Sequence, residues 1–249
     1  MCSTDLRDPR HVLRRRPVRP DRDLPSRDPP LDQVVTLAGT STSELSPEQQ
    51  ERRRSLIDAA FELGAEGGHD AVQMRDVSVT ANVAMATIYR YFSSKDDLLA
   101  AAMTEWTNRL RARVAQSPPR GETMVDQMID VLSRACRAME RQPKLSQALV
   151  RALSSADTGV RESGADVRRQ IASMGDEILA DLDPQVRADI LSAIGHVWYS
   201  TLVSWANGRQ DFPWVTHELE RAARALISPY EQRIVAERTQ GEDPAATQL

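Results

Sequence analysis

The fold of this chain is constrained most by the stretch from Gln73 to Lys95, QMRDVSVTANVAMATIYRYFSSK, which has the pattern of two short helices around a tight turn. Val77 and Ala81 lie four positions apart and give the first helix an apolar stripe. Asn82 follows, and asparagine tolerates the left-handed backbone conformation that a tight turn requires. Val83 is placed to fill the angle between the helices. The stretch therefore predicts a helix-turn-helix.

The second helix of this motif is predicted to begin near Ala84. Ile88 and Phe92 lie four positions apart and are expected to turn back to the core. The other side carries hydroxyls and one guanidinium, which suit phosphates and base edges. These polar residues are Thr87, Tyr89, Arg90 and Tyr91.

Composition limits the classes of protein to which the chain can belong. With 249 residues, of which 41% are hydrophobic and 27% charged, it is long enough for one sizeable core or two modest ones. No apolar run is long enough for a membrane span, and none follows the N-terminal arginines as in a secretory signal, so we expect a cytoplasmic protein with no membrane partner. The net charge of −4 argues against a generic nucleic-acid coat. Sequence-specific DNA binding stays open, because a few cations on one face suffice for it.

Signals for catalysis or metal binding are weak. The sequence has no G-x-S-x-G, phosphate loop, paired-glycine dinucleotide fingerprint or His-x-x-x-His on a helix. Its two cysteines cannot form a disulfide framework or a metal cluster, and Cys136 is expected to be a small core residue. The four histidines are scattered, and His196, beside Trp198, is expected to be a core histidine. We therefore expect no catalytic residue, metal or cofactor, with a cytosolic enzyme as an alternative.

Residues 1–46 are rich in arginine, aspartate, proline, serine and threonine and show hardly any apolar periodicity, which predicts a disordered extension. The extension is either an inert leader or a basic arm that touches DNA phosphates, and its aspartates favour the leader. The arm would consist of Arg14, Arg15, Arg16 and Arg19. The abrupt change of composition near Val34 and Val35 raises the further hypothesis that translation begins there.

Helical signals run through the rest of the chain. Ser46-Pro47-Glu48 combines an N-cap, a proline at the first helical position and an acid in the first turn, while Gly67-Gly68 is a stop signal, so a helix is predicted between them. No alternating strand pattern competes beyond the helix-turn-helix. Further helices are predicted over 95–114, 122–141, 144–154, 160–181, 184–206 and 212–227. The predicted fold class is all-α.

A first helix, a helix-turn-helix and an all-helical remainder together resemble the TetR family of one-component bacterial regulators. The matching motifs stand as Gln73-Met74-Arg75-Asp76, Ala81-Asn82-Val83-Ala84, Ala86-Thr87-Ile88-Tyr89, Tyr91-Phe92 and Ser94-Lys95. Gln73 and Ala84 depart from the family, which usually has capping hydroxyls there, and each loss should cost about 0.5 to 2 kcal/mol of local helix stability. The resemblance implies an N-terminal helix-turn-helix DNA-binding domain over 47–97, a helical effector-binding and dimerisation domain over 98–237, and a disordered tail over 238–249.

Within that family the chain is similar to the actinobacterial repressors of sterol (cholesterol) catabolism. The similarity lies in QERRRSLIDAAFELGAEGGHDAVQMR, VAMATIYRYFSSK, SRACRAMERQPKLSQAL and HVWYSTLVSWANGR. It implies a homodimeric repressor of lipid-degradation genes, released from double-stranded operator DNA by a coenzyme A thioester of a sterol metabolite. The alternatives are a repressor of fatty-acid metabolism or efflux genes with another apolar effector, and a DNA-binding protein without an effector.

The motif also assigns roles on DNA, because its second helix lies in the major groove. Arg75 and Arg90 are candidate base readers, and Met85 and Ala86 offer apolar contact to thymine methyls. Phosphate anchors are expected at Thr87, Tyr89, Tyr91 and Lys95. The alternative for Tyr91 is core packing, and for Lys95 a salt bridge or a surface charge.

Dimerisation needs an apolar surface, which the last two long helices offer. The implied interface residues are Ile194, Val197, Leu202, Leu219, Ala223 and Leu226. The alternative is that these stripes close the core of the monomer, and a helix that is apolar over more than one face can do both.

An apolar effector would need a cavity among the helices between Met103 and Trp205. Large, adaptable side chains are numerous there, although each of them can also be plain core. These candidates are Met103, Trp106, Met124, Met128, Met139, Leu149, Met174, Trp198 and Trp205. A basic run, which either meets a coenzyme A phosphate or forms a solvated helix face, consists of Arg134, Arg137, Arg141, Lys144 and Arg151.

Overall fold

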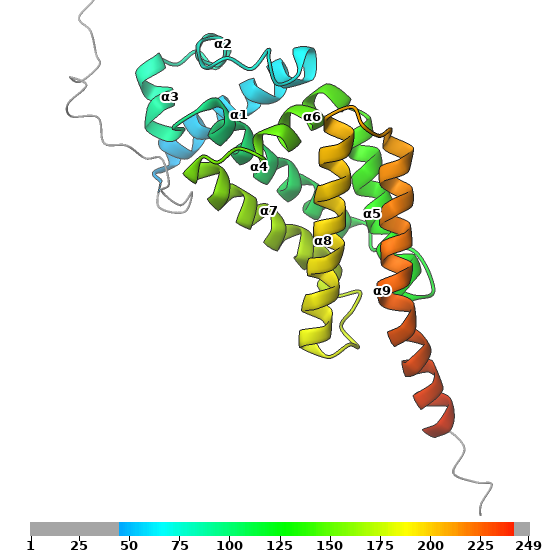
Figure 1. Ribbon diagram of the computed structural model, residues 1–249. Coiled ribbons are helices and arrows are strands. Elements are labelled where there is room, and N and C mark those ends of the chain that lie inside the picture. Colours follow the sequence, from blue (N-terminus) through cyan, green and yellow to red (C-terminus); the bar gives the residue numbers. More distant parts are fainter. Residues whose placement is uncertain (1–44, 242–249) are drawn as a thin grey trace, which may run out of the picture. The chain divides into compact units, whose positions relative to one another are not determined.

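The structure of the protein is a computed structural model that describes residues 45–241, and within this part every regular element is a helix (Figure 1). In chain order the helices are α1 (Pro47–Gly67), α2 (Met74–Thr80), α3 (Met85–Tyr91), α4 (Lys95–Gln116), α5 (Met124–Glu140), α6 (Pro143–Ala152), α7 (Thr158–Asp176), α8 (Pro184–Ala206) and α9 (Phe212–Gly241). The predicted all-α fold class is confirmed. The expectations for residues 1–44 and 242–249, including Cys2, the basic arm and the translation start, lie outside the described residues.

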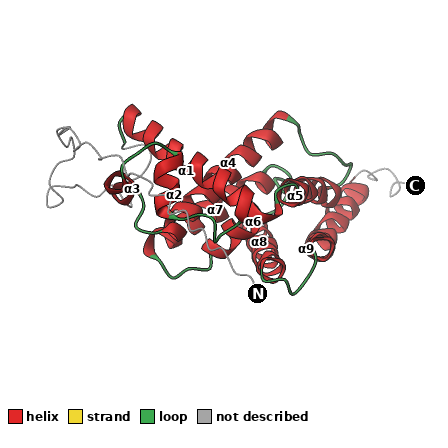
Figure 2. Cartoon of the chain, turned by 90° about the horizontal axis from the view of Figure 1, so that it is seen from above, coloured by secondary structure: helices red, strands yellow, loops and turns green. Residues whose placement is uncertain are grey.

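The helices divide into a head, α1–α3, and a body, α4–α9. The head lies at one end of the described chain, and α8 and α9 lie side by side at the other (Figures 1 and 2). α4 leads out of the head and packs along α7, while α5 packs on α9. α6 packs against α1, α4 and α8. α4 and α6 therefore carry most of the packing between head and body.

The first helix begins where its sequence signals predict. Ser46 Oγ accepts from the backbone N–H of Gln49 at 3.3 Å, and Gln49 Oε1 accepts from the backbone N–H of Ser46 at 2.8 Å. This reciprocal capping box satisfies two donors that a helix start leaves open. Gly68 ends the helix with a φ of 73°, a conformation that favours glycine.

Two helix ends differ from their predictions. α7 stops at Asp176 instead of residue 181, because the chain then turns tightly to bring Asp183 to the start of α8. α9 continues past residue 227 to Gly241, through Pro229. Proline removes one N–H from a helix, and here a long helix tolerates that loss. The helix therefore runs into the stretch that was expected to be a tail.

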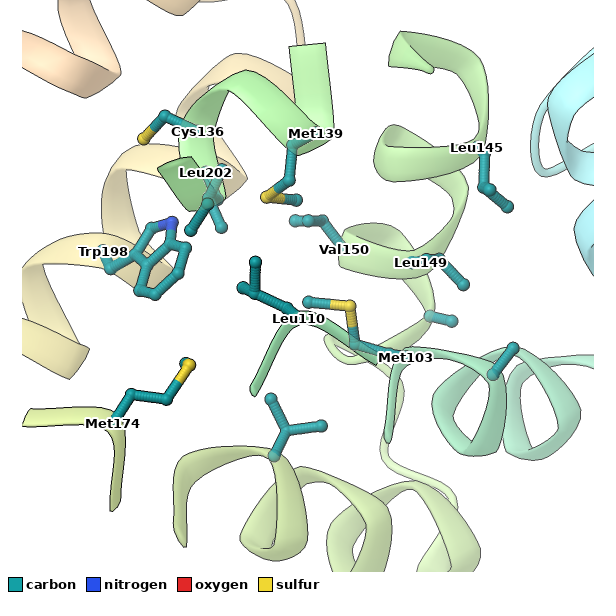
Figure 3. Close-up of a cluster of buried hydrophobic side chains, with 14 of the residues drawn as sticks. Met103, Leu110, Cys136, Met139, Leu145, Leu149, Val150, Met174, Trp198 and Leu202 are labelled. Atoms are coloured by element: carbon teal, nitrogen blue, oxygen red, sulfur yellow. The ribbon is translucent and has the colours of Figure 1, made fainter. Parts of the chain in front are cut away.

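The core of the body gathers side chains from most of its helices. Figure 3 shows Met103, Leu110, Met139 and Trp198 pointing toward one another from α4, α5 and α8. Cys136 is 2% exposed, which confirms it as a small core residue, and burial raises its pKa to about 11. Among the described helices, none combines the length and the apolar character that crossing a bilayer requires.

Candidate DNA-binding head and ligand cavity

The turn between α2 and α3 has the geometry that the sequence predicts. Asn82 has a φ of 53°, in the left-handed region. The backbone N–H of Val83 donates to the carbonyl of Ser78 at 3.0 Å and closes the turn. Val83 is partly buried against the core, between the two helices. The helix-turn-helix is therefore confirmed.

α2 and α3 start without side-chain caps. Gln73 and Ala84 both have the extended backbone of an N-cap, yet neither side chain accepts a hydrogen bond from its helix. The Gln73 side chain instead donates to the carbonyl of Asp70 at 2.8 Å. Each helix has only 7 residues, so it depends on packing rather than on its own hydrogen bonds.

The side chains that pack into the core of the head come from one side of α3. Ile88 is fully buried and Phe92 is 1% exposed, as their spacing predicts. The Arg53 guanidinium of α1 lies over the Phe92 ring, 5.3 Å from its centroid. Burial lowers the pKa of Arg53. This arginine of α1 thus supports the core of the head instead of standing free for DNA.

The opposite side of α3 is open to solvent. Tyr89 is 49% exposed and Met85 is 37% exposed, while Arg75 is an exposed residue of α2. Ala86, Thr87 and Arg90 are half-buried. The Nε of Arg90 is buried without a hydrogen-bond partner. Of the predicted DNA contacts, Arg75, Met85 and Tyr89 are therefore the most accessible, and Ala86, Thr87 and Arg90 are only partly accessible.

Two further predicted DNA contacts, Tyr91 and Lys95, interact with other parts of the protein. Tyr91 is 5% exposed, and its ring centroid lies 6.5 Å from that of Phe92, so the alternative of core packing describes its ring. Lys95 Nζ donates to the carbonyl of His69 at 3.3 Å, and His69 Nε2 lies 2.9 Å from Asp96 Oδ1. Lys95 thus ties the start of α4 to the segment between α1 and α2.

The body contains a cavity of about 730 Å³ with a mainly apolar wall. Its lining comes from α4, the end of α6, α7 and α8. Predicted lining residues are Met103, Trp106 and Trp198, and apolar residues that sequence reasoning missed are Val150, Leu153, Val167, Ile171, Ala172, Leu191 and Leu202. A mainly apolar space of this size, partly open to solvent, fits a small hydrophobic ligand.

Six of the nine residues proposed for this pocket do not line it. Met128, Met139, Leu149 and Met174 are buried core side chains, and Met124 packs against the core from the start of α5. Trp205 packs edge-on against Phe212, with ring centroids 4.9 Å apart. Size and flexibility identified large buried side chains, but the packing of α4, α7 and α8 around the cavity decides which of them face it.

Polar side chains stand among the apolar lining residues. His196 is exposed, and its Nδ1 lies 2.7 Å from the carbonyl of Ser192, so the expectation of a core histidine is wrong. Tyr199 Oη lies 3.1 Å from Ser154 Oγ. Arg168 also lines the cavity. The cavity therefore offers a cation and hydroxyl groups to a polar end of a ligand.

The basic run predicted for a coenzyme A phosphate is used mainly within the protein. Arg134 forms a 2.5 Å ion pair with Asp130. Lys144 Nζ donates to the carbonyl of Glu66 at 2.8 Å, and Arg151 donates to the carbonyl of Ala206 at 3.0 Å. Lys144 and Arg151 thus satisfy carbonyls at the ends of α1 and α8, a common structural role for cations.

Four of the six predicted dimer residues are buried inside the monomer. Ile194, Leu202, Leu219 and Ala223 are at most 5% exposed, so they close the core between α8, α9 and their neighbours. Val197 and Leu226 are only partly buried against this core. A dimer interface on α8 and α9 would therefore use their outer face. Val197 and Leu226 are the predicted residues that lie on this face, beside more polar side chains.

The chain is similar to known proteins along most of its length. A family model described as bacterial regulatory proteins, tetR family, matches residues 56–102, and one described as the tetracyclin repressor-like C-terminal domain matches residues 121–226. The HTH-type transcriptional repressor KstR of Mycobacterium tuberculosis is 35% identical over 202 residues, which cover 80% of this chain and 92% of that protein.

Solved structures show the same fold. A TetR transcriptional regulator from Rhodococcus sp. RHA1 matches with a TM-score of 0.65 and 29% identity, over 72% of this chain and 97% of that one. Thermus thermophilus FadR, a TetR-family repressor solved in complex with lauroyl-CoA, matches with a TM-score of 0.58 and 19% identity, over 70% and 93% of the two chains. The chain has a helix-turn-helix on a helical body, and it matches the TetR family models and the repressor KstR. It therefore belongs to the TetR family and is a transcriptional regulator rather than an enzyme.

Proposed function

We propose that the protein is a dimeric repressor that binds double-stranded operator DNA and releases it when an apolar acyl-coenzyme A effector fills the body. One observation carries this proposal: an apolar cavity of about 730 Å³ lies behind the DNA-binding head of a chain that is 35% identical to the repressor KstR. The resemblance to repressors of sterol catabolism extends into the cavity-forming helices. We therefore propose a sterol-derived thioester as the effector and lipid-degradation genes as the target, in the cytoplasm.

On DNA, α3 would lie in the major groove with its open face toward the bases. Arg75 and Arg90 would read base edges, while Met85 and Ala86 would contact thymine methyls. Phosphate anchors would be Thr87, Tyr89 and Lys95, with Tyr91 limited to its hydroxyl because its ring is buried. Residues 47–97 would then act as the DNA-binding domain and 98–237 as the effector and dimer domain.

Two heads are needed because one helix-turn-helix reads too few base pairs for useful specificity. We propose that α8 and α9 pair with the same helices of a second copy, using Val197, Leu226 and the positions around them. A mass measurement in solution tests this directly, and a strict monomer on and off DNA would contradict it.

A mobility-shift titration tests the whole proposal. The DNA is the region upstream of the protein's own gene, and the added compounds are the coenzyme A thioester of a steroid side-chain acid, lauroyl-CoA and the two free acids. We expect the steroid thioester to release the protein and the free acids to leave it bound. Release by lauroyl-CoA alone would favour a regulator of fatty-acid metabolism, and no release would favour a DNA-binding protein without an effector.

A further inference from the structure

A group of serine and aspartate side chains connects the end of α3 to the start of α7. Ser93 and Ser94 form the turn between α3 and α4, and Asp157 directly precedes α7. Ser94 Oγ donates to Asp157 Oδ2 at 2.7 Å, across 63 positions of the chain. Ser93 Oγ lies 3.3 Å from each oxygen of the same carboxylate. With Asp97, these residues form what we call the serine–aspartate latch.

Members of the latch also cap the two helices that it connects. Ser94 Oγ accepts from the backbone N–H of Asp97 at 3.1 Å and so caps α4. Asp157 Oδ1 accepts from the backbone N–H of Gly159 at 3.0 Å and so caps α7. Because the two capping side chains also bond each other, the two helix starts cannot separate without breaking the hydrogen bond between Ser94 and Asp157.

The latch is closely packed as well as hydrogen-bonded. Asp97 is 7% exposed and accepts from the backbone N–H of Ser93 at 2.8 Å and from its hydroxyl at 3.0 Å. A Cβ on Gly159 would lie 2.3 Å from Asp97 Oδ1, so the first turn of α7 rests directly on this carboxylate. A shift of α7 along α4 would therefore displace the Asp97 carboxylate and disturb its hydrogen bonds with Ser93.

Each end of the latch leads to one of the two sites. α3 ends at Tyr91, two residues before Ser93, so the latch lies where the DNA-facing helix leaves the head. On the other side, Leu153 and then Val167 of α7 belong to the wall of the apolar cavity. The chain between Leu153 and Val167 contains Asp157. Asp157 therefore lies on the segment that joins two parts of the cavity wall.

We propose that the serine–aspartate latch transmits the state of the cavity to the head, and that Asp157 is a positioning residue for α3. The inference rests on the proposed function. With the latch closed, the body holds α3 and α4 in the arrangement that binds DNA. A ligand that displaces α7 opens the latch and releases the head, which is a shift between two packed states.

The test compares two aspartates with the same local role. Asp157→Ala removes the cap of α7 and the latch, whereas Asp183→Ala removes the cap of α8, where the carboxylate accepts from the N–H groups of Gln185 at 2.9 Å and Val186 at 3.3 Å. Both full-length variants should melt below the wild type. Only Asp157→Ala should also lose affinity for the DNA upstream of the gene, by about tenfold. Affinities of the two variants that agree within about twofold would overturn the proposal.

Transmission is tested with the coenzyme A thioester of a steroid side-chain acid as the probe. It should lower the DNA affinity of Asp183→Ala as it does for the wild type, and have a smaller effect on Asp157→Ala, in which the latch is already open. An equal effect on both variants would overturn transmission. A wild type that ignores this thioester counts against the proposed effector, and the DNA affinities above still decide the role of Asp157.

A failure of the proposed function is distinguishable from a failure of the latch. If the wild type does not bind the DNA at all, hydrogen exchange over residues 85–97 replaces the affinity measurement. Asp157→Ala should then exchange about tenfold faster there than Asp183→Ala, because local opening of the head costs less. Equal exchange in the two variants would overturn the latch.

Discussion

Two helix pairs in this protein start in opposite ways. α2 and α3 in the head have 7 residues each and no side-chain cap, whereas α7 and α8 in the body have 19 and 23 residues and are both capped by an aspartate. The body helices carry their own start signals and are long enough to gain from them. The head helices are held by Val77, Ile88 and Phe92, all at most 1% exposed. Local sequence thus specifies α7 and α8, and tertiary packing specifies α2 and α3.

The strongest test of this difference is to remove a buried side chain from the head. Ile88 is fully buried and Tyr89, the next residue, is 49% exposed. We expect Ile88→Ala to lower the free energy of unfolding by about 2 to 5 kcal/mol, because it leaves a cavity in a small core. Tyr89→Ala should change stability by no more than about 0.5 kcal/mol. Urea denaturation of both variants measures the difference, and similar losses would show that the head does not depend on its inner face.

A second test asks whether the ligand binds in the cavity of the body. Gly195 of α8 lines the cavity, and a Cβ built there meets nothing within 4 Å. Gly195→Leu should fill part of the space and weaken binding of the effector thioester by about 1 to 3 kcal/mol, because the leucine side chain takes volume that the ligand needs. Gly195→Ala is the matched control and should raise stability by about 0.5 to 1 kcal/mol, since alanine is the better helix former. Calorimetric titration of both variants checks this, and undiminished binding by the leucine variant would place the ligand elsewhere.

Changes to the helix caps should have smaller effects on stability, in opposite directions in the head and in the body. Ala84→Ser should add a cap to α3 and raise the free energy of unfolding by about 0.5 to 2 kcal/mol. Thr123 Oγ1 caps α5 by accepting from the backbone N–H of Asp126 at 3.1 Å, so Thr123→Ala should lower it by a similar amount. Thermal melts of the two variants should move in opposite directions. A neutral Ala84→Ser would mean that the start of α3 is set by packing alone.

The smallest expected effect is a pH dependence at the junction of head and body. Burial raises the pKa of the Asp97 carboxyl above its ordinary value. A carboxyl of this kind destabilises the folded state increasingly as pH rises from the ordinary aspartate value of about 4 through its folded pKa. The stability of Asp97→Asn relative to the wild type should therefore increase between pH 4 and neutrality. Urea midpoints at several pH values measure it, and a decrease would contradict the direction of the shift.

Much of the fold could be predicted because its signals are local. Ser46 and Pro47 marked the start of α1, and Asn82 marked the turn between α2 and α3. Helix ends were less certain where the chain had to reverse: the segment after Asp176 reads as helix, but the cap at Asp183 needs a turn before it.

The candidate site was predictable only in part. The exposed face of α3 follows from helical periodicity, and Ile88 and Tyr89 were placed correctly by it. The cavity wall depends on how far apart α7 and α8 lie, which no local pattern encodes, so Met139 was proposed and Val167 was missed. The contact between Ser94 and Asp157 spans 63 positions and had no signal in the sequence.

The missing caps of α2 and α3 have a thermal consequence. Helices held by packing alone lose order at lower temperature than the capped helices of the body, through local opening of the head. DNA binding must then order part of the head again, and its enthalpy becomes more negative on warming, as in coupled folding and binding. The repressor we propose would therefore release its operator on heating before its body unfolds, which makes it respond to temperature as well as to its ligand.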